Sequence, residues 1–103
     1  MAFHYLLIYT YANDYLERRG LFREHHLETI KPLIDRGEVL LGGALSDPFD
    51  TGLILFLIPD PTIATAFAAS DPYVVNGLVT RWEVRRWVTV VGERAAEPIS
   101  SVN

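Results

Sequence analysis

The pattern that most constrains the fold of this chain is an alternation of short extended segments with helical ones. Residues 3–10 read FHYLLIYT, which is rich in aromatic and β-branched residues and too short for a core helix, so they predict a buried strand. Three further strands are predicted at residues 38–45, 52–59 and 79–91. Helical spacing is found at residues 15–35 and 62–70. The predicted order is therefore strand, helix, strand, strand, helix, strand.

The first helix is predicted from Tyr15 to Asp35, and Gly37 is expected to end it. Gly20 lowers its helical propensity, and Pro32 removes a backbone hydrogen bond, so a kink or a loosened last turn is expected. The helix should still form through an apolar face. At about 100° per residue, that face gathers Leu16, Phe22, Leu27, Ile30, Leu33 and Ile34.

Turn-forming residues separate the middle segments. The stretch SDPFDT predicts a hairpin between the second and third strands, because Asp, Pro and Thr favour turns. Thr62 is expected to cap the second helix. The run GGA at 42–44 lacks the spacing and the lysine of a phosphate loop, so its glycines are expected to mark a bulge or to leave room for a ligand.

In the last strand the apolar side chains change parity between Trp82 and Trp87, which predicts a bulge or bend near Arg85 and Arg86. The tail that follows is polar and is expected to fray. We therefore predict one domain over residues 1–92 and a polar tail over residues 93–103.

This order of segments matches the ferredoxin-like βαββαβ arrangement, an α+β fold in which both helices cover one face of a four-stranded antiparallel sheet. The runs LLIY and LILFLI are apolar on both parities, so the second sheet face should also be covered. The chain has no element left to cover it. A homodimer that pairs sheet to sheet, or a higher homo-oligomer, is the simplest solution.

Composition excludes several classes of function. A length of 103 residues, half of them apolar, suits one domain with a single core. The net charge of -4 opposes binding to nucleic acid, and the absence of cysteine removes disulfides and thiolate chemistry. No apolar run reaches about 18 residues and no basic leader is seen, so we expect a cytoplasmic protein without a membrane segment.

The first helix carries polar side chains in the middle of its apolar face. His26 falls between Phe22 and Ile30 on the helical wheel, whereas His25 points to the opposite side. Arg19 and Arg23 lie one and two turns before His26 on the same face. The simpler interpretation is a core histidine bonded to a backbone carbonyl, with arginines that extend to solvent. The other is a functional histidine beside cationic groups.

Asp71 has a structural and a functional interpretation as well. Asp followed by Pro72 is a preferred opening of a helical turn, with Asp as its cap. A carboxylate has two oxygens, so Asp71 can also accept a hydrogen bond from an imidazole. Both helices lie on one sheet face in this fold, which permits contact with His26. Tyr73, Asn76 and Arg81 follow closely and are candidate contacts for a small polar ligand.

Other catalytic and metal-binding patterns are missing. His4 lies on an early strand without a second histidine at ligand spacing, so we expect no metal site. Ser46, Ser70 and Ser100 lack the G-x-S-x-G context of a nucleophilic serine. No cofactor is predicted.

Over residues 3–91 the chain resembles the YciI-like family, also called YCII-related proteins. The resemblance is carried by RGLFREHHLETI in the first helix, by GEVLLGGAL after it and by DPYVVNGLV before the last strand, and DPYV is its most specific part. It implies a ferredoxin-like fold that dimerises through its sheets as a dimeric α/β barrel. It also implies a cleft with a His and Asp pair proposed as catalytic, at His26 and Asp71. Pro32 departs from the family pattern and would alter the far end of the cleft.

Together these observations predict a small cofactor-independent enzyme of lyase or isomerase type. His26, oriented by Asp71, would transfer a proton to or from a small cyclic or aromatic acid-like substrate. Arg19 and Arg23 would anchor its negative charge, and Tyr73 would contact it. Two alternatives stay open: a non-catalytic dimer that binds a small molecule or serves as an accessory protein, and a structural dimer with a silent, buried His26.

Overall fold

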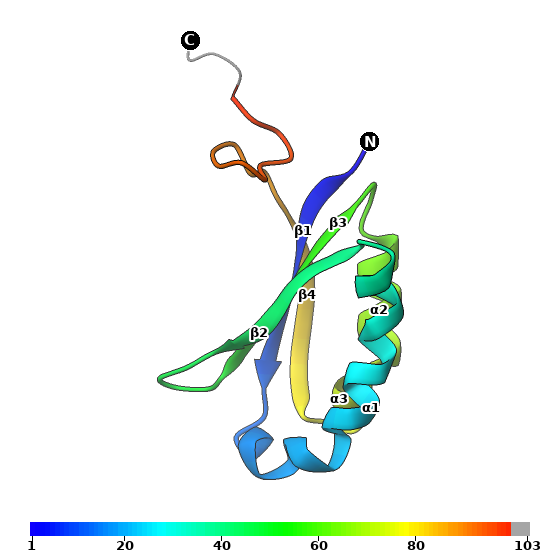
Figure 1. Cartoon of the computed structure of the whole chain (residues 1–103). Helices are drawn as coiled ribbons and strands as arrows, with labels where there is room; N and C mark the ends of the chain where they lie inside the picture. The colour runs from blue at the N-terminus through cyan, green and yellow to red at the C-terminus, as the bar shows by residue number, and fades with distance from the viewer. Residues whose placement is uncertain (100–103) are drawn as a thin grey trace.

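The computed structural model describes residues 1–99 and consists of a sheet with helices on one of its faces (Figure 1). The strands are β1 (Phe3–Tyr11), β2 (Val39–Leu45), β3 (Thr51–Ile58) and β4 (Val79–Trp87). The helices are α1 (Tyr15–Asp35), α2 (Thr62–Ser70) and α3 (Pro72–Val75). The chain thus has the predicted βαββαβ order, with α3 as one additional turn before β4.

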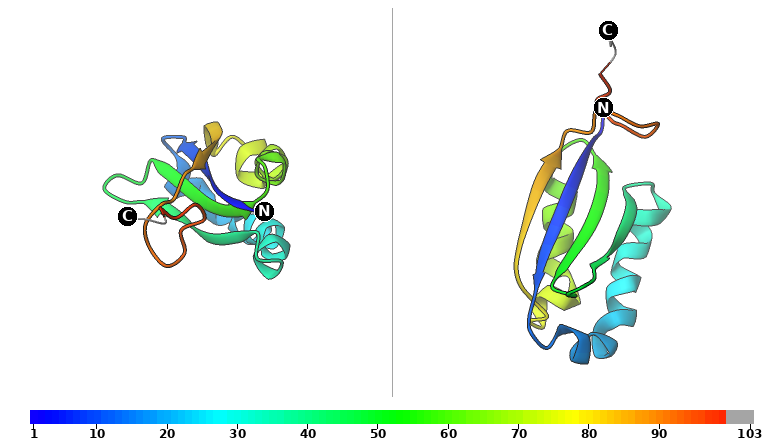
Figure 2. Two further views of the ribbon diagram at one scale, coloured as in Figure 1. Left: turned by 90° about the horizontal axis from the view of Figure 1, so that it is seen from above. Right: turned by 90° about the vertical axis from the view of Figure 1, so that its left-hand side faces the viewer.

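The sheet has the order β2-β3-β1-β4, and each neighbouring pair is antiparallel. The helices lie on one side of this sheet (Figure 1), and in the right-hand view of Figure 2 α2 lies behind the strands while α1 extends past the β2 edge. This arrangement confirms the predicted ferredoxin-like α+β fold. It follows from connections that are short between β2 and β3 and helical elsewhere.

The core lies between the sheet and the helices. Along β3, Ile54, Phe56 and Ile58 are buried against the helices, while the alternate residues Leu53 and Leu55 are half-buried on the other face. This alternation has the period of two that a strand imposes. Ala64 and Ala68 of α2 are buried, and their small side chains let the helix approach the sheet closely.

Helix α1 has the predicted bounds and continues through Pro32, and Gly37 ends it in the left-handed region at φ 76°. Its predicted apolar face is only partly buried, because Leu16, Leu27 and Ile34 are each about half exposed. The helix contacts α3 and β2 rather than lying across the whole sheet. A cleft therefore opens between α1 and the sheet.

Two local features in the middle of the chain differ from the prediction. The bulge of β2 lies between Val39 and Leu41 and the pairing is regular from Leu41 to Leu45, so the paired glycines do not mark a bulge. The alternative, that they leave room for a ligand, stays a prediction. Thr62 is not the cap of α2, because Asp60 Oδ1 accepts from the Thr62 backbone N–H at 2.9 Å. The N-cap position is held by Pro61, which has no side-chain acceptor, so the Asp60 carboxylate one residue earlier satisfies this first N–H of the helix.

The last strand also differs from the prediction. Arg85 and Arg86 pair regularly with β1, and the irregularity lies instead where Thr10 and Tyr11 face the start of β4. The strand ends at Trp87, so no bend is needed to reconcile the parity of later residues. The chain then folds back, with the backbone N–H of residues 97 and 99 donating to carbonyls of residues 89 and 90. These bonds hold part of the tail that was expected to fray, and residues 100–103 lie outside the described residues.

The sheet face opposite the helices is open. It is largely apolar over β1, β2 and β3, whereas β4 adds the charged residues Arg81, Glu83 and Arg85. A concavity of about 300 Å³ on this face is bordered by Leu6, Leu45, Leu55 and Trp87, and Leu45 and Trp87 are about half exposed. Large exposed apolar areas of this kind mark interaction surfaces. Within the described part of the chain, no helix combines the length and the hydrophobicity that a membrane span requires.

Candidate active site

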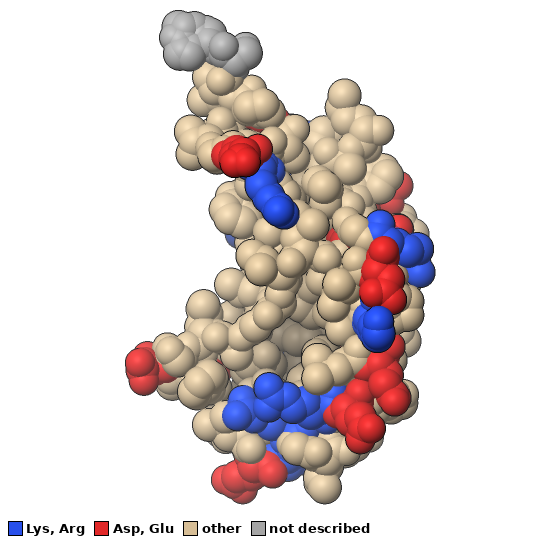
Figure 3. Space-filling view, viewed as in Figure 1, with Lys and Arg blue, Asp and Glu red and all other residues tan. Residues whose placement is uncertain are grey.

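The cleft between α1 and strands β2 and β3 has a volume of about 520 Å³. Figure 3 shows it as a hollow on the front of the molecule, with Lys and Arg side chains gathered below it. Arg19, Arg23 and His26 of α1 border the cleft on one side, and Gly42 and Ile54 of the sheet border it on the other. The volume lies within the range of about 300–1,000 Å³ that is typical of small-molecule sites.

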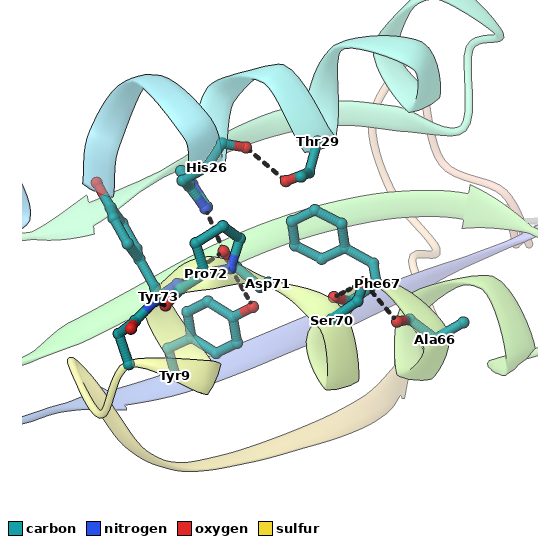
Figure 4. Close-up of polar contacts among 10 residues, drawn as sticks. Tyr9, His26, Thr29, Ala66, Phe67, Ser70, Asp71, Pro72 and Tyr73 are labelled. Carbon is teal, nitrogen blue, oxygen red and sulfur yellow. Dashed lines mark hydrogen bonds and ion pairs between the residues drawn. The ribbon is translucent and has the colours of Figure 1, made fainter. Parts of the chain in front are cut away.

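His26 and Asp71 meet at the wall of this cleft. The distance between His26 Nδ1 and Asp71 Oδ1 is 2.8 Å (Figure 4). The Asp71 side chain has no exposed surface, whereas 13% of the His26 side chain is exposed. The structure thus brings together the two residues that the sequence identified as a candidate pair. The aspartate is sealed from water, and the histidine reaches the cleft.

Asp71 is held by three donors. It is the cap of α3, where Oδ1 accepts from the Tyr73 backbone N–H at 3.1 Å as well as from His26, and Pro72 occupies the first helical position. The Tyr9 hydroxyl of β1 donates to Oδ2 at 2.6 Å. Asp71 therefore caps its turn and also accepts a hydrogen bond from the histidine, and its functional interpretation stays a prediction. The donors satisfy a carboxylate whose burial would otherwise be costly.

Aromatic side chains fix the plane of the His26 ring. The Tyr73 ring stacks on it with centroids 4.0 Å apart and planes 4° apart, and Phe67 of α2 meets it edge-on at 6.2 Å. With Nδ1 donating to Asp71, the unprotonated nitrogen of the neutral ring is Nε2. No hydrogen bond among residues 1–99 uses Nε2. The ring is thus oriented and retains one nitrogen that can accept a proton.

Two arginines add positive charge to the cleft. The Arg19 guanidinium lies 5.8 Å from the centre of the Tyr15 ring and 5.9 Å from that of Phe49, which belongs to the loop between β2 and β3. Neither Arg19 nor Arg23 takes part in an ion pair within the described residues. Their charges are therefore available to an anionic ligand.

Tyr73 borders the cleft, but two other predicted contacts do not lie there. The Asn76 side chain donates to the Pro72 carbonyl at 2.8 Å and so closes the end of α3. Arg81 is exposed on β4, outside the cleft lining. The sequence placed both residues near Asp71 along the chain, but the turn at α3 and the edge position of β4 separate them from His26.

Tyr9 is a member of the site that sequence reasoning missed. It lies on the buried parity of β1, in the segment that the sequence predicts only as a buried strand, and its hydroxyl contacts Asp71. A buried tyrosine hydroxyl requires a partner, and this requirement was the available signal. Burial raises the pKa of Tyr9 well above its ordinary value of 10.0, and the nearby Asp71 carboxylate raises it further. Tyr9 therefore remains a donor.

This raised pKa predicts a loss of stability at alkaline pH. Above pH 10.0 the unfolded chain releases the Tyr9 proton, whereas the folded protein retains it. Below pH 10.0 the full contribution of Tyr9 to the free energy of unfolding is present. Above it, each further pH unit should lower that contribution by about 1.4 kcal/mol. Urea unfolding across alkaline pH should show a shallower decline for Tyr9→Phe than for the wild type. Equal slopes would contradict the proposed role of burial.

Among the residues that the structure describes, no three His, Cys, Asp or Glu side chains are grouped to hold a metal ion. The cleft presents an imidazole with a carboxylate behind it, and arginine and tyrosine side chains around it. These groups can bind an anion and move a proton.

Comparisons with known proteins agree with this fold. The model of the YCII-related domain matches residues 3–88. A solved structure, 5-chloro-2-hydroxyhydroquinone dehydrochlorinase (TftG) from Burkholderia phenoliruptrix AC1100 in complex with 2,5-dihydroxybenzoquinone, is similar with a TM-score of 0.69 and 18% sequence identity. The similarity covers 84% of this chain and 94% of that one. The search of curated proteins gives no match. The chain belongs to the YCII-related domain family.

Proposed function

We propose that this protein is a small enzyme that needs no cofactor and uses His26 for proton transfer on a small cyclic or aromatic acid-like substrate. The observation that carries the proposal is the 2.8 Å contact between His26 Nδ1 and the buried Asp71 carboxylate, at the wall of a cleft of about 520 Å³. A base held in one tautomer beside a ligand-sized cavity is the arrangement that proton transfer requires.

Each side chain has a defined role in this proposal. Asp71 orients the ring and balances the positive charge that the imidazole gains when Nε2 accepts a proton. Arg19 and Arg23 bind the acidic group of the substrate, and Tyr73 positions the imidazole by stacking. TftG has a similar fold, and its name specifies a hydroxylated, chlorinated single ring. This supports a hydroxylated ring as the class of substrate to test first.

The reaction is of lyase or isomerase type. In a lyase step, His26 Nε2 removes a proton from the substrate, and the electron pair left behind expels a leaving group with its bonding electrons. In an isomerase step, the same nitrogen returns the proton to another atom of the ring. Both steps balance without an external oxidant or reductant. Both begin with proton removal at His26.

The alternative is a non-catalytic protein that holds a small molecule in the same cleft. The half-exposed apolar residues around the cleft and the arginines would serve binding equally well. This alternative predicts that a ligand is bound and released unchanged.

Proton NMR spectra of a ligand panel distinguish the two functions. The panel should contain 5-chloro-2-hydroxyhydroquinone, 2,5-dihydroxybenzoquinone and simple aromatic acids, incubated with the wild type and with His26→Gln. New ligand signals with the wild type alone would support the enzyme, including an isomerase that leaves the mass unchanged. Line broadening without new signals in either protein would favour the binding protein.

We also propose that the protein forms a homodimer through the open sheet face. The concavity between Leu6, Leu55 and Trp87 on this face is apolar, and no described element of the chain covers it. A second copy presents the same apolar surface, so a two-fold arrangement would bury both at once. The strands that form this face also form the floor of the catalytic cleft on their other side.

Leu55→Glu should convert the dimer to a monomer, because a carboxylate would be buried without a partner in the sheet-to-sheet interface. Light scattering coupled to size-exclusion chromatography measures the mass directly. Leu21→Glu is the matched control, since Leu21 is 79% exposed on α1 and should leave the dimer intact. A wild type that elutes as a monomer at all concentrations would contradict the proposal.

A further inference from the structure

Strand β2 contains two consecutive glycines, Gly42 and Gly43, although glycine inside a strand lowers stability. The backbone does not require them. The glycines with φ in the left-handed region are Gly37, Gly77 and Gly92, so neither residue of β2 has a conformation that excludes a side chain. A different reason is needed for the absence of a side chain here.

Packing does not require glycine at position 42 either. A Cβ atom built on Gly42 would lie 3.6 Å from Ile54 Cγ1 and 3.8 Å from the Leu53 carbonyl oxygen, which are ordinary contact distances. Gly52 provides the contrast, because a Cβ there would lie 2.2 Å from the Tyr11 hydroxyl. A side chain at position 52 would displace the Tyr11 ring, whereas one at position 42 would meet only ordinary contacts.

A side chain at position 42 would point into the cleft. Gly42 pairs with Ile54, which is buried on the helix-covered side of the sheet, and both residues border the cleft. His26 borders the same cleft from α1. The cleft therefore has a bare stretch of backbone on one side and the candidate base on the other.

We propose that Gly42 determines the size of the ring that the cleft accepts. The flat face of a ring lies against the bare backbone of β2, while its acidic group reaches Arg19 and Arg23 and its reacting atom faces His26. A side chain at position 42 would occupy the ring's place. This inference rests on the proposed function, because it assumes that the cleft binds a ring with a negative charge.

Two ring acids of different size test the inference. Dissociation constants for benzoate and 2-naphthoate should be measured by NMR titration with the wild type, Gly42→Ala and Gly42→Val. A difference of one methyl-sized group in a pocket changes the preference for one ligand over another by about 10–200-fold. Gly42→Ala should therefore weaken 2-naphthoate binding about tenfold or more, with a smaller effect on benzoate. Gly42→Val should weaken both.

Thermal unfolding separates this effect from a loss of folding. Gly42→Ala should raise the melting temperature by about 2 to 5 °C, because alanine is favoured over glycine in a strand. Gly20→Ala is the matched control, since Gly20 is exposed on α1, lies outside the cleft lining and has no atom within 4 Å of a built Cβ. It should also raise the melting temperature, and it should leave both dissociation constants unchanged.

The outcomes are distinguishable. If the wild type binds the acids and Gly42→Val binds both with wild-type affinity, the proposed role of Gly42 in ring size is contradicted. The proposed function is not affected by that result. If Gly42→Ala lowers the melting temperature, glycine is required for folding and the inference is also overturned. If the wild type binds neither acid, both the inference and the proposed binding of acidic rings fail.

Discussion

Replacement of Asp71 with alanine is expected to lower the free energy of unfolding by about 3–5 kcal/mol. The Asp71 side chain is fully buried and accepts hydrogen bonds from Tyr9, His26 and the Tyr73 backbone. Alanine would leave these donors without a partner and would remove the cap of α3. Urea unfolding monitored by circular dichroism measures the change.

Two variants provide the controls for this prediction. Asp71→Asn retains an oxygen for the cap and for His26, so its loss of stability should be smaller, at about 1–2 kcal/mol. Asp60→Ala removes an exposed acceptor at the start of α2 and should have only a small effect, because no buried donor is left unpaired. If Asp71→Ala were as stable as Asp60→Ala, the three-donor arrangement would not stabilise the fold.

Replacement of His26 with glutamine should lower kcat/KM by about 10²–10⁴-fold, the usual contribution of a general base. Glutamine can still donate to Asp71 and lie against Tyr73, so the cleft should keep its shape and the arginines their positions. KM should change much less than kcat, because proton transfer is lost and binding is retained. Steady-state kinetics on any ligand that the wild type converts measures both parameters.

His25→Gln is the control for this variant. His25 is the adjacent residue on α1, but it is exposed and does not border the cleft. Its replacement should leave kcat and KM at wild-type values. Equal activity of His26→Gln and His25→Gln would exclude His26 as the base, and a non-catalytic role for the cleft would then be the better account.

The order of the elements and the identity of the candidate pair could be predicted because local signals and tertiary structure agree. Helical spacing separated His26 from His25, and the Asp-Pro sequence at residues 71 and 72 specified the start of a helical turn. The βαββαβ fold then places both helices on one sheet face. The position of Asp71 directly after α2 therefore brings it under α1, where His26 lies.

The exposure of α1 could not be predicted because helical periodicity specifies a face and not the distance to its partner. Leu27 and Ile34 belong to the apolar face, yet they are half exposed at the border of the cleft. A helix packed fully on the sheet would have buried them and closed the site. Apolar residues that line a ligand cleft have the same pattern in sequence as apolar residues in a core.

Tyr9 was missed for a related reason. Its position on a buried strand predicted packing, and the sequence does not specify which polar atom meets its hydroxyl across 62 residues of chain. Two further details depend on backbone geometry in turns: the Asp60 carboxylate accepts from the Thr62 N–H at the start of α2, and β4 ends at Trp87. Residue preferences in the sequence do not specify the end of a helix or strand to the exact residue.

The exchange of carbon-bound ring protons with solvent tests the central claim most directly, because it reports proton transfer before any product forms. The wild type, His26→Gln and Asp71→Asn should each be incubated in deuterium oxide with 2,5-dihydroxybenzoquinone, and the loss of the ring-proton signal followed by NMR. We expect the wild type to accelerate the exchange, Asp71→Asn to do so more slowly, and His26→Gln to match the rate without protein. Equal acceleration by the wild type and His26→Gln would contradict the account.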